Sequence, residues 1–313
     1  MENELYYPYS KYLKDKYKEK VYKLPIKLNL TCPNRDGNVA YGGCIFCSET
    51  GGSFENLSEE MPVREQLDKN KDYISRRYGA KKFIAYFQNF TNTYMDIDKF
   101  KKVINEAIID DVVAISISTR PDCIYDEQLE FLYEVKGKYN IDIVFELGLQ
   151  TVNYHSLEKL NRAHGLSDFL LASKKIKKYG FEICVHMIIG LPWDDELDII
   201  EGAKIISIME VDEVKIHSLY IPKNTKLEKM YLNKKIETIS LEKYIEYVII
   251  FLRYLNPNIA IQRLVGRMPK EDSVFCNWST SWWKIRDMIH NQMIDENIRQ
   301  GDRYNYNKGL RML

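Results

Sequence analysis

The stretch DVVAISISTRPD, residues 111–122, contains the two features that decide the fold. Its first part is a short apolar, β-branched run, which is typical of a strand buried on both faces of a parallel sheet. Its second part, STRPD, is a polar cluster at the expected end of that strand. Five similar runs occur elsewhere: LPIKLNL (24–30), KFIAYF (82–87), IDIVFELGL (141–149), FEICVHMIIG (181–190) and VDEVKIHSLY (211–220).

Amphipathic segments with helical periodicity lie between these runs. The clearest are residues 97–108, 125–139 and 167–180, and Gly180 is placed to end the last of them. Strand and helix candidates therefore alternate, with most strand starts about thirty residues apart, as in βα units. We expect an α/β fold, a partial (β/α)6 TIM-like barrel, with a doubly wound sheet as the alternative.

Three regions are expected along the chain. Residues 1–20 are rich in Tyr and Lys, and we interpret them as a solvated N-terminal segment rather than a functional arm. Residues 21–230 contain all the strand candidates and form the predicted barrel. Residues 231–313 form an α-rich C-terminal extension, with a long helix predicted over 240–255.

The bulk composition restricts the function. The 45 Lys and Arg residues balance 45 Asp and Glu residues, so any RNA contact must come from a local patch. No run reaches about eighteen apolar residues, and the N-terminus lacks an apolar signal-peptide core. We therefore expect a cytoplasmic protein without a membrane partner, whose six cysteines are thiols or metal ligands rather than disulfides.

Three cysteines lie in one polar, glycine-rich loop, TCPNRDGNVAYGGCIFCSETGG (31–52). Eleven residues separate Cys32 from Cys44, and two separate Cys44 from Cys47. Structural zinc normally takes four protein ligands, whereas three thiolates suit an iron–sulfur cluster with one open coordination position. Gly42-Gly43 and Gly51-Gly52 permit positive φ angles and close backbone approach. The isolated Cys123, Cys184 and Cys276 are interpreted as small core hydrophobes.

On these features the chain resembles the radical S-adenosylmethionine (SAM) superfamily, whose commonest signature is CxxxCxxC with an aromatic residue before the last cysteine. Here that residue is Phe46. The longer first gap is shared by a subgroup related to the radical-SAM domain of the Elongator catalytic subunit. More closely, the chain is similar to YhcC/YtqA-type (MnmL-like) proteins. The similarity extends over nearly the whole chain, through CPNRDG, GGCIFC, YFQNFTNTY, STRPD, ELGLQT, HMIIGLPWD and the Trp-containing tail.

The resemblance implies that Cys32, Cys44 and Cys47 are the catalytic metal ligands of a [4Fe–4S] cluster, with SAM chelated at the fourth iron. Reductive cleavage of SAM would give a 5′-deoxyadenosyl radical that abstracts hydrogen from the substrate. Without the resemblance, Gln150 and Arg162 could equally be strand-end caps, and His186 a core histidine. The implied SAM-binding residues are Phe46, Gln88, Asn89, Thr91, Ser118, Arg120, Gln150, Arg162, His186 and Leu191.

The implied activity is tRNA modification, in which 5-carboxymethylaminomethyluridine at the wobble position becomes 5-aminomethyluridine. The implied partners are tRNA, an external one-electron reductant of the flavodoxin or ferredoxin type, and a downstream tRNA methyltransferase. One alternative is a radical SAM enzyme acting on a small molecule or a protein. Another is a zinc-stabilised nucleic-acid- or protein-binding module with His164 or Cys276 as fourth ligand.

Two regions could supply a local RNA-binding patch. One is the Lys-rich N-terminus, and the other is the C-terminal region with Arg263, Arg267 and Lys270. The tryptophans of the latter region are interpreted first as packing residues, with a stacking surface for a nucleobase as the alternative: Trp278, Trp282 and Trp283.

Overall fold

The computed structural model describes residues 4–48 and 57–306 of the chain. Seven strands form one sheet in the order β1-β2-β3-β4-β5-β6-β8, and β7 and β9 form a second, two-stranded sheet. Helices connect the strands of the large sheet, as predicted for a TIM-like α/β fold with a helical C-terminal part. The predicted fold class is confirmed, although the large sheet has seven strands rather than six.

The chain divides into two compact units. The N-terminal unit comprises Ser10–Gly148 and Ser167–Cys184. The C-terminal unit comprises Met1–Tyr9, Leu149–Leu166 and Val185–Leu313. Each unit is described by itself below.

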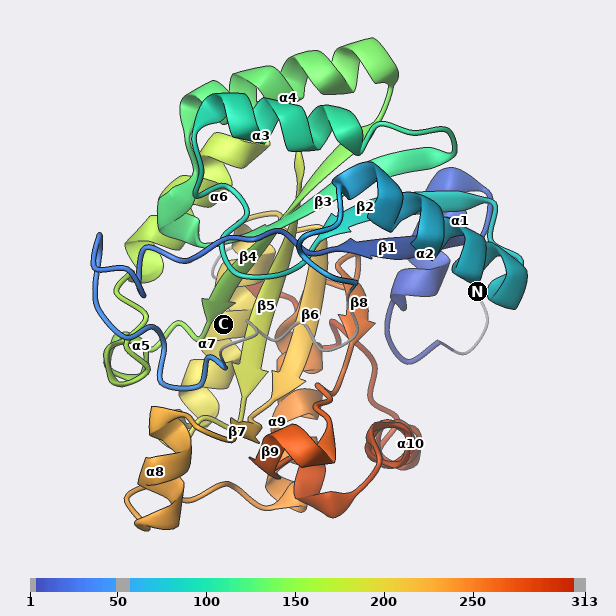
Figure 1. Cartoon of the computed structure of the whole chain (residues 1–313). Coiled ribbons are helices and arrows are strands. Elements are labelled where there is room, and N and C mark those ends of the chain that lie inside the picture. Colours follow the sequence, from blue (N-terminus) through green and yellow to red (C-terminus); the bar gives the residue numbers. More distant parts are fainter. Residues whose placement is uncertain (1–3, 49–56, 307–313) are drawn as a thin grey trace. The chain divides into compact units, whose positions relative to one another are not determined.

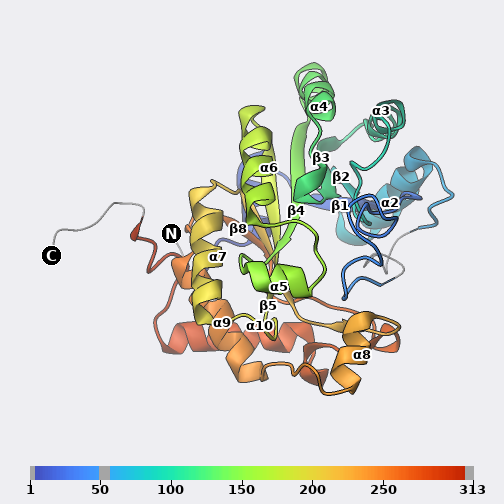
Figure 2. The same ribbon diagram turned by 90° about the vertical axis from the view of Figure 1, so that its left-hand side faces the viewer.

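The N-terminal unit is built on parallel strands that pair in sequence order (Figure 1). They are β1 (Val21–Ile26), β2 (Lys82–Phe87), β3 (Val112–Thr119) and β4 (Asp142–Gln150), and β5 (Glu182–Ile189) begins in the same unit. The connecting helices are α2 (Val63–Tyr78), α3 (Ile97–Glu106), α4 (Asp126–Tyr139) and α6 (Leu166–Lys178). Figure 2 shows α3 and α4 beside one another.

The helices form where the apolar periodicity predicts them. In α3, Phe100, Val103 and Ile104 are buried on one face, and the Asp96 side chain caps the helix by accepting a hydrogen bond from Lys99 N at 2.8 Å. Gly180 follows the end of α6 with a φ of +67°, as expected for a helix stop.

The first strand was placed incorrectly from sequence, because it covers Val21–Ile26 rather than residues 24–30. Two side chains that are distant in the sequence accept hydrogen bonds from the backbone N–H groups that follow this strand. Lys27 N donates to Gln66 Oε1 at 2.9 Å, and Leu28 N donates to Asn89 Oδ1 at 3.1 Å. These side-chain hydrogen bonds take the place of backbone pairing with β2 after Ile26, and the chain continues from there into the cysteine loop.

The expectation of a solvated N-terminal segment is also wrong. Residues Tyr9–Tyr17 form α1, whose Leu13 is buried. Tyr12 donates to Glu182 at 2.9 Å, Tyr17 donates to Asp142 at 2.8 Å, and Lys16 forms ion pairs with both carboxylates. This part of the Lys- and Tyr-rich sequence therefore anchors the chain terminus to the sheet.

The C-terminal unit contains β6 (Glu213–Ser218) paired in parallel with the unpredicted β8 (Ala260–Arg263). The short β7 (Ile221–Pro222) and β9 (Ser273–Phe275) pair antiparallel. The helix predicted over 240–255 is α9, which packs against α7 and α10 (Figure 2). The helices of the C-terminal unit are α5 (Tyr154–Lys159), α7 (Glu196–Ile208), α8 (Lys226–Leu232), α9 (Leu241–Tyr254) and α10 (Trp282–Asp295). Within the described ranges, no helix has the length and apolar character needed to cross a membrane.

Candidate functional site

The cysteine loop follows β1, and its long gap is closed by local backbone hydrogen bonds. Val39 N donates to Pro33 O at 2.9 Å, and Gly43 N donates to Asn34 O at 2.8 Å. These bonds fold residues 33–43 back on themselves, so Asn34, two residues after Cys32, lies beside Gly43, the residue before Cys44. Cys47 N then donates to Cys44 O at 2.9 Å. Eleven residues of sequence thus become a compact turn between the first two cysteines.

The glycine prediction holds for the described part of the loop. Gly42 and Gly43 have φ angles of +79° and +73°, which a residue with a side chain rarely adopts. A Cβ on Gly43 would also lie 3.0 Å from Arg35 Cγ. Gly51 and Gly52 lie outside the described residues.

Cys44 has a buried hydrogen-bond donor that the sequence did not reveal. Asn34 is fully buried, and its Nδ2 lies 3.4 Å from Cys44 Sγ. A charged sulfur accepts a stronger hydrogen bond than a neutral one. Asn34 is therefore placed to donate to the sulfur of a metal-bound Cys44.

Arg120, at the end of β3, places a buried positive charge beside the cysteines. Its Nε and Nη2 donate to the two carboxylate oxygens of Asp122 at 2.8 and 2.6 Å. Burial alone would lower the pKa of Arg120, but the hydrogen-bonded Asp122 and the nearby Cys32 and Cys44 outweigh burial and raise it. The guanidinium group is thus a permanent cation next to two of the three candidate ligands.

The three thiols and their surroundings fit a thiolate-bound cluster. Cys44 is buried, whereas Cys32 and Cys47 are partly exposed, and none of the three forms a disulfide. The buried Asn34 donor and the nearby Arg120–Asp122 ion pair supply polar groups beside these sulfurs. Phe46, the predicted shielding residue between Cys44 and Cys47, is half-buried.

The segment after β2, which was predicted to contact SAM, is held by its own asparagines. Asn89 accepts from Leu28 N and donates from Nδ2 to Leu28 O at 2.7 Å, so its side chain is engaged with backbone. Asn92 donates from Nδ2 to Asn89 O at 2.7 Å and Ser118 O at 2.9 Å. Thr91 is buried and Gln88 half-buried. A ligand that binds here would therefore contact backbone groups of this segment rather than the Asn89 side chain, which is already bonded to Leu28.

Ser118, the other predicted residue on β3, belongs to a buried polar network. Its Oγ donates to Tyr86 Oη at 3.4 Å, and Tyr86 donates to Glu146 Oε2 at 2.9 Å. Glu146 has a fully buried side chain, accepts from Ser116 at 3.1 Å and pairs with Lys23. Burial, followed by the nearby Glu146 charge, raises the pKa of Tyr86, so its hydroxyl remains protonated.

Two of the isolated cysteines behave as the sequence predicted. Cys123 and Cys184 are 2% and 0% exposed, as expected for core residues. Burial, with the neighbouring Asp122, raises the pKa of the Cys123 thiol to about 12. Cys276 is only half-buried, and burial raises its pKa as well. A thiol with a raised pKa is a poor metal ligand at neutral pH.

The C-terminal unit contains the remaining predicted SAM residues. Gln150 ends β4 with a φ of +74°, a strained conformation for a residue with a side chain. Arg162 is buried, and its Nη2 lies 2.8 Å from His164 Nε2. This contact engages Nε2 of His164. Leu191 is buried next to Gly190, which has a φ of +92°.

His186 lies in a stack that the sequence did not predict. Its ring centroid is 5.2 Å from that of His217, and Nδ1 of His186 is 3.3 Å from Nε2 of His217. Arg263 Nη2 contacts the His217 ring nitrogens at 2.6 and 2.8 Å. A guanidinium group only donates and a neutral imidazole accepts at one nitrogen, so at most one of these two contacts is a hydrogen bond.

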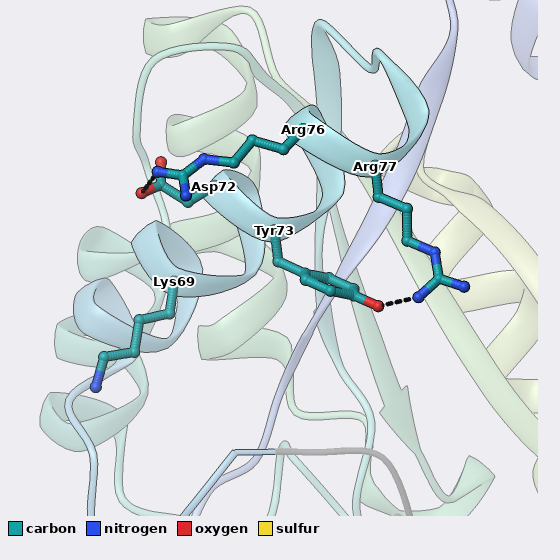
Figure 3. A pocket seen from close by; sticks show the side chains of 5 residues that line it. All are labelled: Lys69, Asp72, Tyr73, Arg76 and Arg77. Carbon is teal, nitrogen blue, oxygen red and sulfur yellow. Dashed lines mark hydrogen bonds and ion pairs between the residues drawn. The ribbon is translucent and has the colours of Figure 1, made fainter.

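A shallow groove lies on the exposed side of α2 (Figure 3). It is lined by Lys69, Asp72, Tyr73, Arg76 and Arg77. Arg76 pairs with Asp72 at 3.6 Å, Lys69 pairs with Glu65 at 2.8 Å, and Arg77 donates to the Tyr73 hydroxyl. These pairs between successive helical turns are what a solvated helix face forms, so the groove has no evident role in catalysis.

Comparison with known proteins identifies relatives over nearly the full length. Residues 32–203 match the radical SAM superfamily, and residues 211–295 match the radical SAM C-terminal domain. The chain is 37% identical over 308 residues to protein MJ0486 of Methanocaldococcus jannaschii, covering 97% of this chain and 94% of that protein. It is 34% identical over 299 residues to YtqA of Bacillus subtilis, covering 95% and 92%.

More distant matches cover parts of longer proteins. A 148-residue region, 46% of this chain, is 28% identical to the tRNA uridine(34) acetyltransferase of M. jannaschii and covers 26% of it. The structure of Elp3 from Methanocaldococcus infernus aligns with a TM-score of 0.66 at 16% identity. That alignment covers 90% of this chain and 64% of the Elp3 chain. At this identity the likeness shows a shared fold.

Proposed function

Because the chain belongs to the radical SAM superfamily, whose members use a [4Fe–4S] cluster and SAM, we propose that it modifies wobble uridine in tRNA. The proposed reaction removes the carboxymethyl group of 5-carboxymethylaminomethyluridine. Hydrogen abstraction from its methylene, with loss of one further electron, would give an imine that water cleaves to 5-aminomethyluridine and glyoxylate, with SAM as the two-electron oxidant. The observation that carries the radical chemistry is the folded cysteine loop with its buried Asn34 donor and the Arg120 cation. The zinc-module alternative is set aside on the family assignment.

Cys32, Cys44 and Cys47 would hold the cluster. When bound, the cluster supplies the electron that cleaves SAM and so provides a radical able to abstract hydrogen. The protein's own contribution is positional and electrostatic. Asn34 donates to Cys44, and the guanidinium group of the Arg120–Asp122 ion pair lies near Cys32 and Cys44. Phe46 would exclude water from the site, as radical chemistry requires.

The segment Gln88–Thr91 would present backbone groups to the amino group of SAM. Its conformation is fixed because Asn89 and Asn92 bond to backbone on both sides of it. The remaining candidates, Ser118, Gln150, Arg162, His186 and Leu191, are proposed SAM contacts. Preorganised polar groups of this kind hold a cofactor without paying for reorganisation at each turnover.

The tRNA substrate is supported by the activities that relatives carry in their names. One relative is a tRNA uridine(34) acetyltransferase, and another, 23% identical over 201 residues, is the tRNA-2-methylthio-N(6)-dimethylallyladenosine synthase of Fusobacterium nucleatum. Both act on tRNA, and the first acts on the wobble uridine. An external one-electron reductant and a later methyltransferase would complete the proposed pathway.

Nucleoside analysis of bulk tRNA tests this proposal. A strain lacking the gene should accumulate 5-carboxymethylaminomethyluridine and lose 5-aminomethyluridine and its derivatives. The wild-type gene should restore the pattern, whereas a gene with Cys44→Ala should not. An unchanged nucleoside profile in the deletion strain would exclude this substrate.

A further inference from the structure

The first turn of α10 carries two neighbouring, exposed tryptophans. Trp282 is 41% exposed and Trp283 is 46% exposed. Their neighbour Trp278 is engaged, because its Nε1 donates to Ile239 O at 2.8 Å and its ring packs against Tyr244 and Phe275. The packing prediction therefore holds for Trp278 only. Successive helix residues point in different directions, so the two indoles offer two separate exposed rings to a partner.

A strained turn orients this part of the chain. Asn277, Trp278 and Ser279 have φ angles of +50°, +50° and +56°, three successive left-handed residues with side chains. Each such residue costs about 1 kcal/mol or more, so the turn persists only because its contacts fix it. Ser218 Oγ donates to Asn277 Oδ1 at 2.6 Å, and Asn277 Nδ2 donates to Gly266 O at 2.8 Å.

These contacts attach the turn to the carboxyl end of β6. Ser218 is the last residue of that strand, and β9, which leads into the turn, pairs with β7 just beyond it. In parallel α/β folds the carboxyl ends of the strands carry the ligand sites. The strained turn therefore fixes where α10 begins relative to the carboxyl end of β6.

Cations accompany both indole rings. Lys284 Nζ lies 5.5 Å from the centroid of the Trp283 ring, and the Arg286 guanidinium lies 5.7 Å from that of Trp282. The first turn of α10 contains no acidic residue, and the next carboxylate along the helix, Asp287, pairs with Arg286 at 2.7 Å. Aromatic faces beside cations are the combination that binds unpaired bases and their phosphates.

We propose that Trp282 and Trp283 form a stacking surface for unpaired bases of an RNA loop, with Lys284 and Arg286 beside the phosphates. This proposal rests on tRNA being the substrate and identifies where the loop would be held. We favour RNA over an apolar protein partner because cations accompany both exposed rings, and RNA binding uses both features. The zero net charge of the chain is compatible with a surface that relies on stacking more than on charge.

Binding of a short RNA stem-loop to the full-length protein tests the proposal without the reaction. Fluorescence anisotropy of a labelled anticodon stem-loop should show that Trp282→Ala and Trp283→Ala each weaken binding about tenfold, the usual effect of removing one stacking ring. Trp282→Phe and Trp283→Phe should retain most of the affinity. Tyr133→Ala removes an exposed aromatic residue from α4 and should leave binding unchanged.

Three results would overturn the proposal. The first is equal affinity of the wild-type protein and the two alanine variants for the stem-loop. The second is equal tryptophan dependence for a fully paired duplex of the same length, which offers no free base. The third is concentration-dependent dimerisation that both alanine variants abolish, because a second copy would then cover the surface.

The test separates this proposal from the proposed function. Reductive SAM cleavage without RNA should proceed at the wild-type rate in both alanine variants, because the tryptophans are not cluster or SAM residues. If the deletion strain has normal tRNA nucleosides but the variants still lose RNA binding, the reaction proposal fails and the surface proposal stands. If nucleosides change but RNA binding does not depend on the tryptophans, only the surface proposal fails.

Discussion

Replacing Asn34 by alanine should weaken cluster retention while leaving the apoprotein almost unchanged. The Asn34 Nδ2 donor lies 3.4 Å from Cys44 Sγ. A hydrogen bond to a charged acceptor contributes about 1.5 to 3 kcal/mol, whereas a bond to a neutral thiol contributes much less. The loss is therefore felt mainly when Cys44 is a metal-bound thiolate. This difference corresponds to about a tenfold to hundredfold loss of cluster affinity.

The assay is anaerobic competition between the reconstituted protein and an iron chelator, followed by the visible absorption of the cluster. Asn38→Ala is a matched control, because Asn38 lies in the same loop, is exposed and donates to Tyr94 Oη at 2.8 Å. Thermal unfolding of each apoprotein reports general loop damage. Equal chelator resistance of Asn34→Ala and the wild type, or equal loss in both variants, would refute the role assigned to Asn34.

Two further predictions concern stability. Lys23→Met should lower the free energy of unfolding by about 3 kcal/mol in urea titrations, because it withdraws the cation paired with the buried Glu146 carboxylate. The double variant Lys23→Met with Glu146→Gln should recover part of that loss, and no recovery would contradict the pairing. Burial raises the pKa of Asp194 to about 6, despite hydrogen bonds from Ser156 and Thr151. The stabilising effect of its protonated form is thus lost as the pH rises through about 6. Asp194→Asn should therefore gain about 2 kcal/mol relative to the wild type between pH 4 and pH 7, and a pH-independent difference would count against the burial.

The fold could be predicted where the deciding interactions are local. The run KFIAYF has the bounds of β2, and the helical periodicity of residues 97–108 locates α3. The predictions fail where residues far apart in the sequence determine the structure. The end of β1 depends on Gln66 and Asn89, and the anchoring of α1 depends on Glu182, 170 residues from Tyr12. The four-residue β8 carries too short a pattern to be distinguished from a loop.

The candidate site shows the same division. Three cysteines in one loop predict the candidate ligands, because iron–sulfur clusters are held by thiolates. They could not reveal Asn34, since an asparagine in a polar loop is typical of turns and its burial depends on the folded loop. The stack of His186 on His217 joins two strands, and no local pattern predicts which side chains meet across a sheet.

The most direct test of the proposed reaction is reconstitution with purified components under anaerobic conditions. The wild-type protein, loaded with iron and sulfide and supplied with SAM, a reductant and tRNA carrying 5-carboxymethylaminomethyluridine, should yield 5-aminomethyluridine and 5′-deoxyadenosine. Variants with Cys32, Cys44 or Cys47 replaced by alanine should yield neither. Formation of 5′-deoxyadenosine without any change in the tRNA, under conditions where the stem-loop binds, would contradict the proposed substrate.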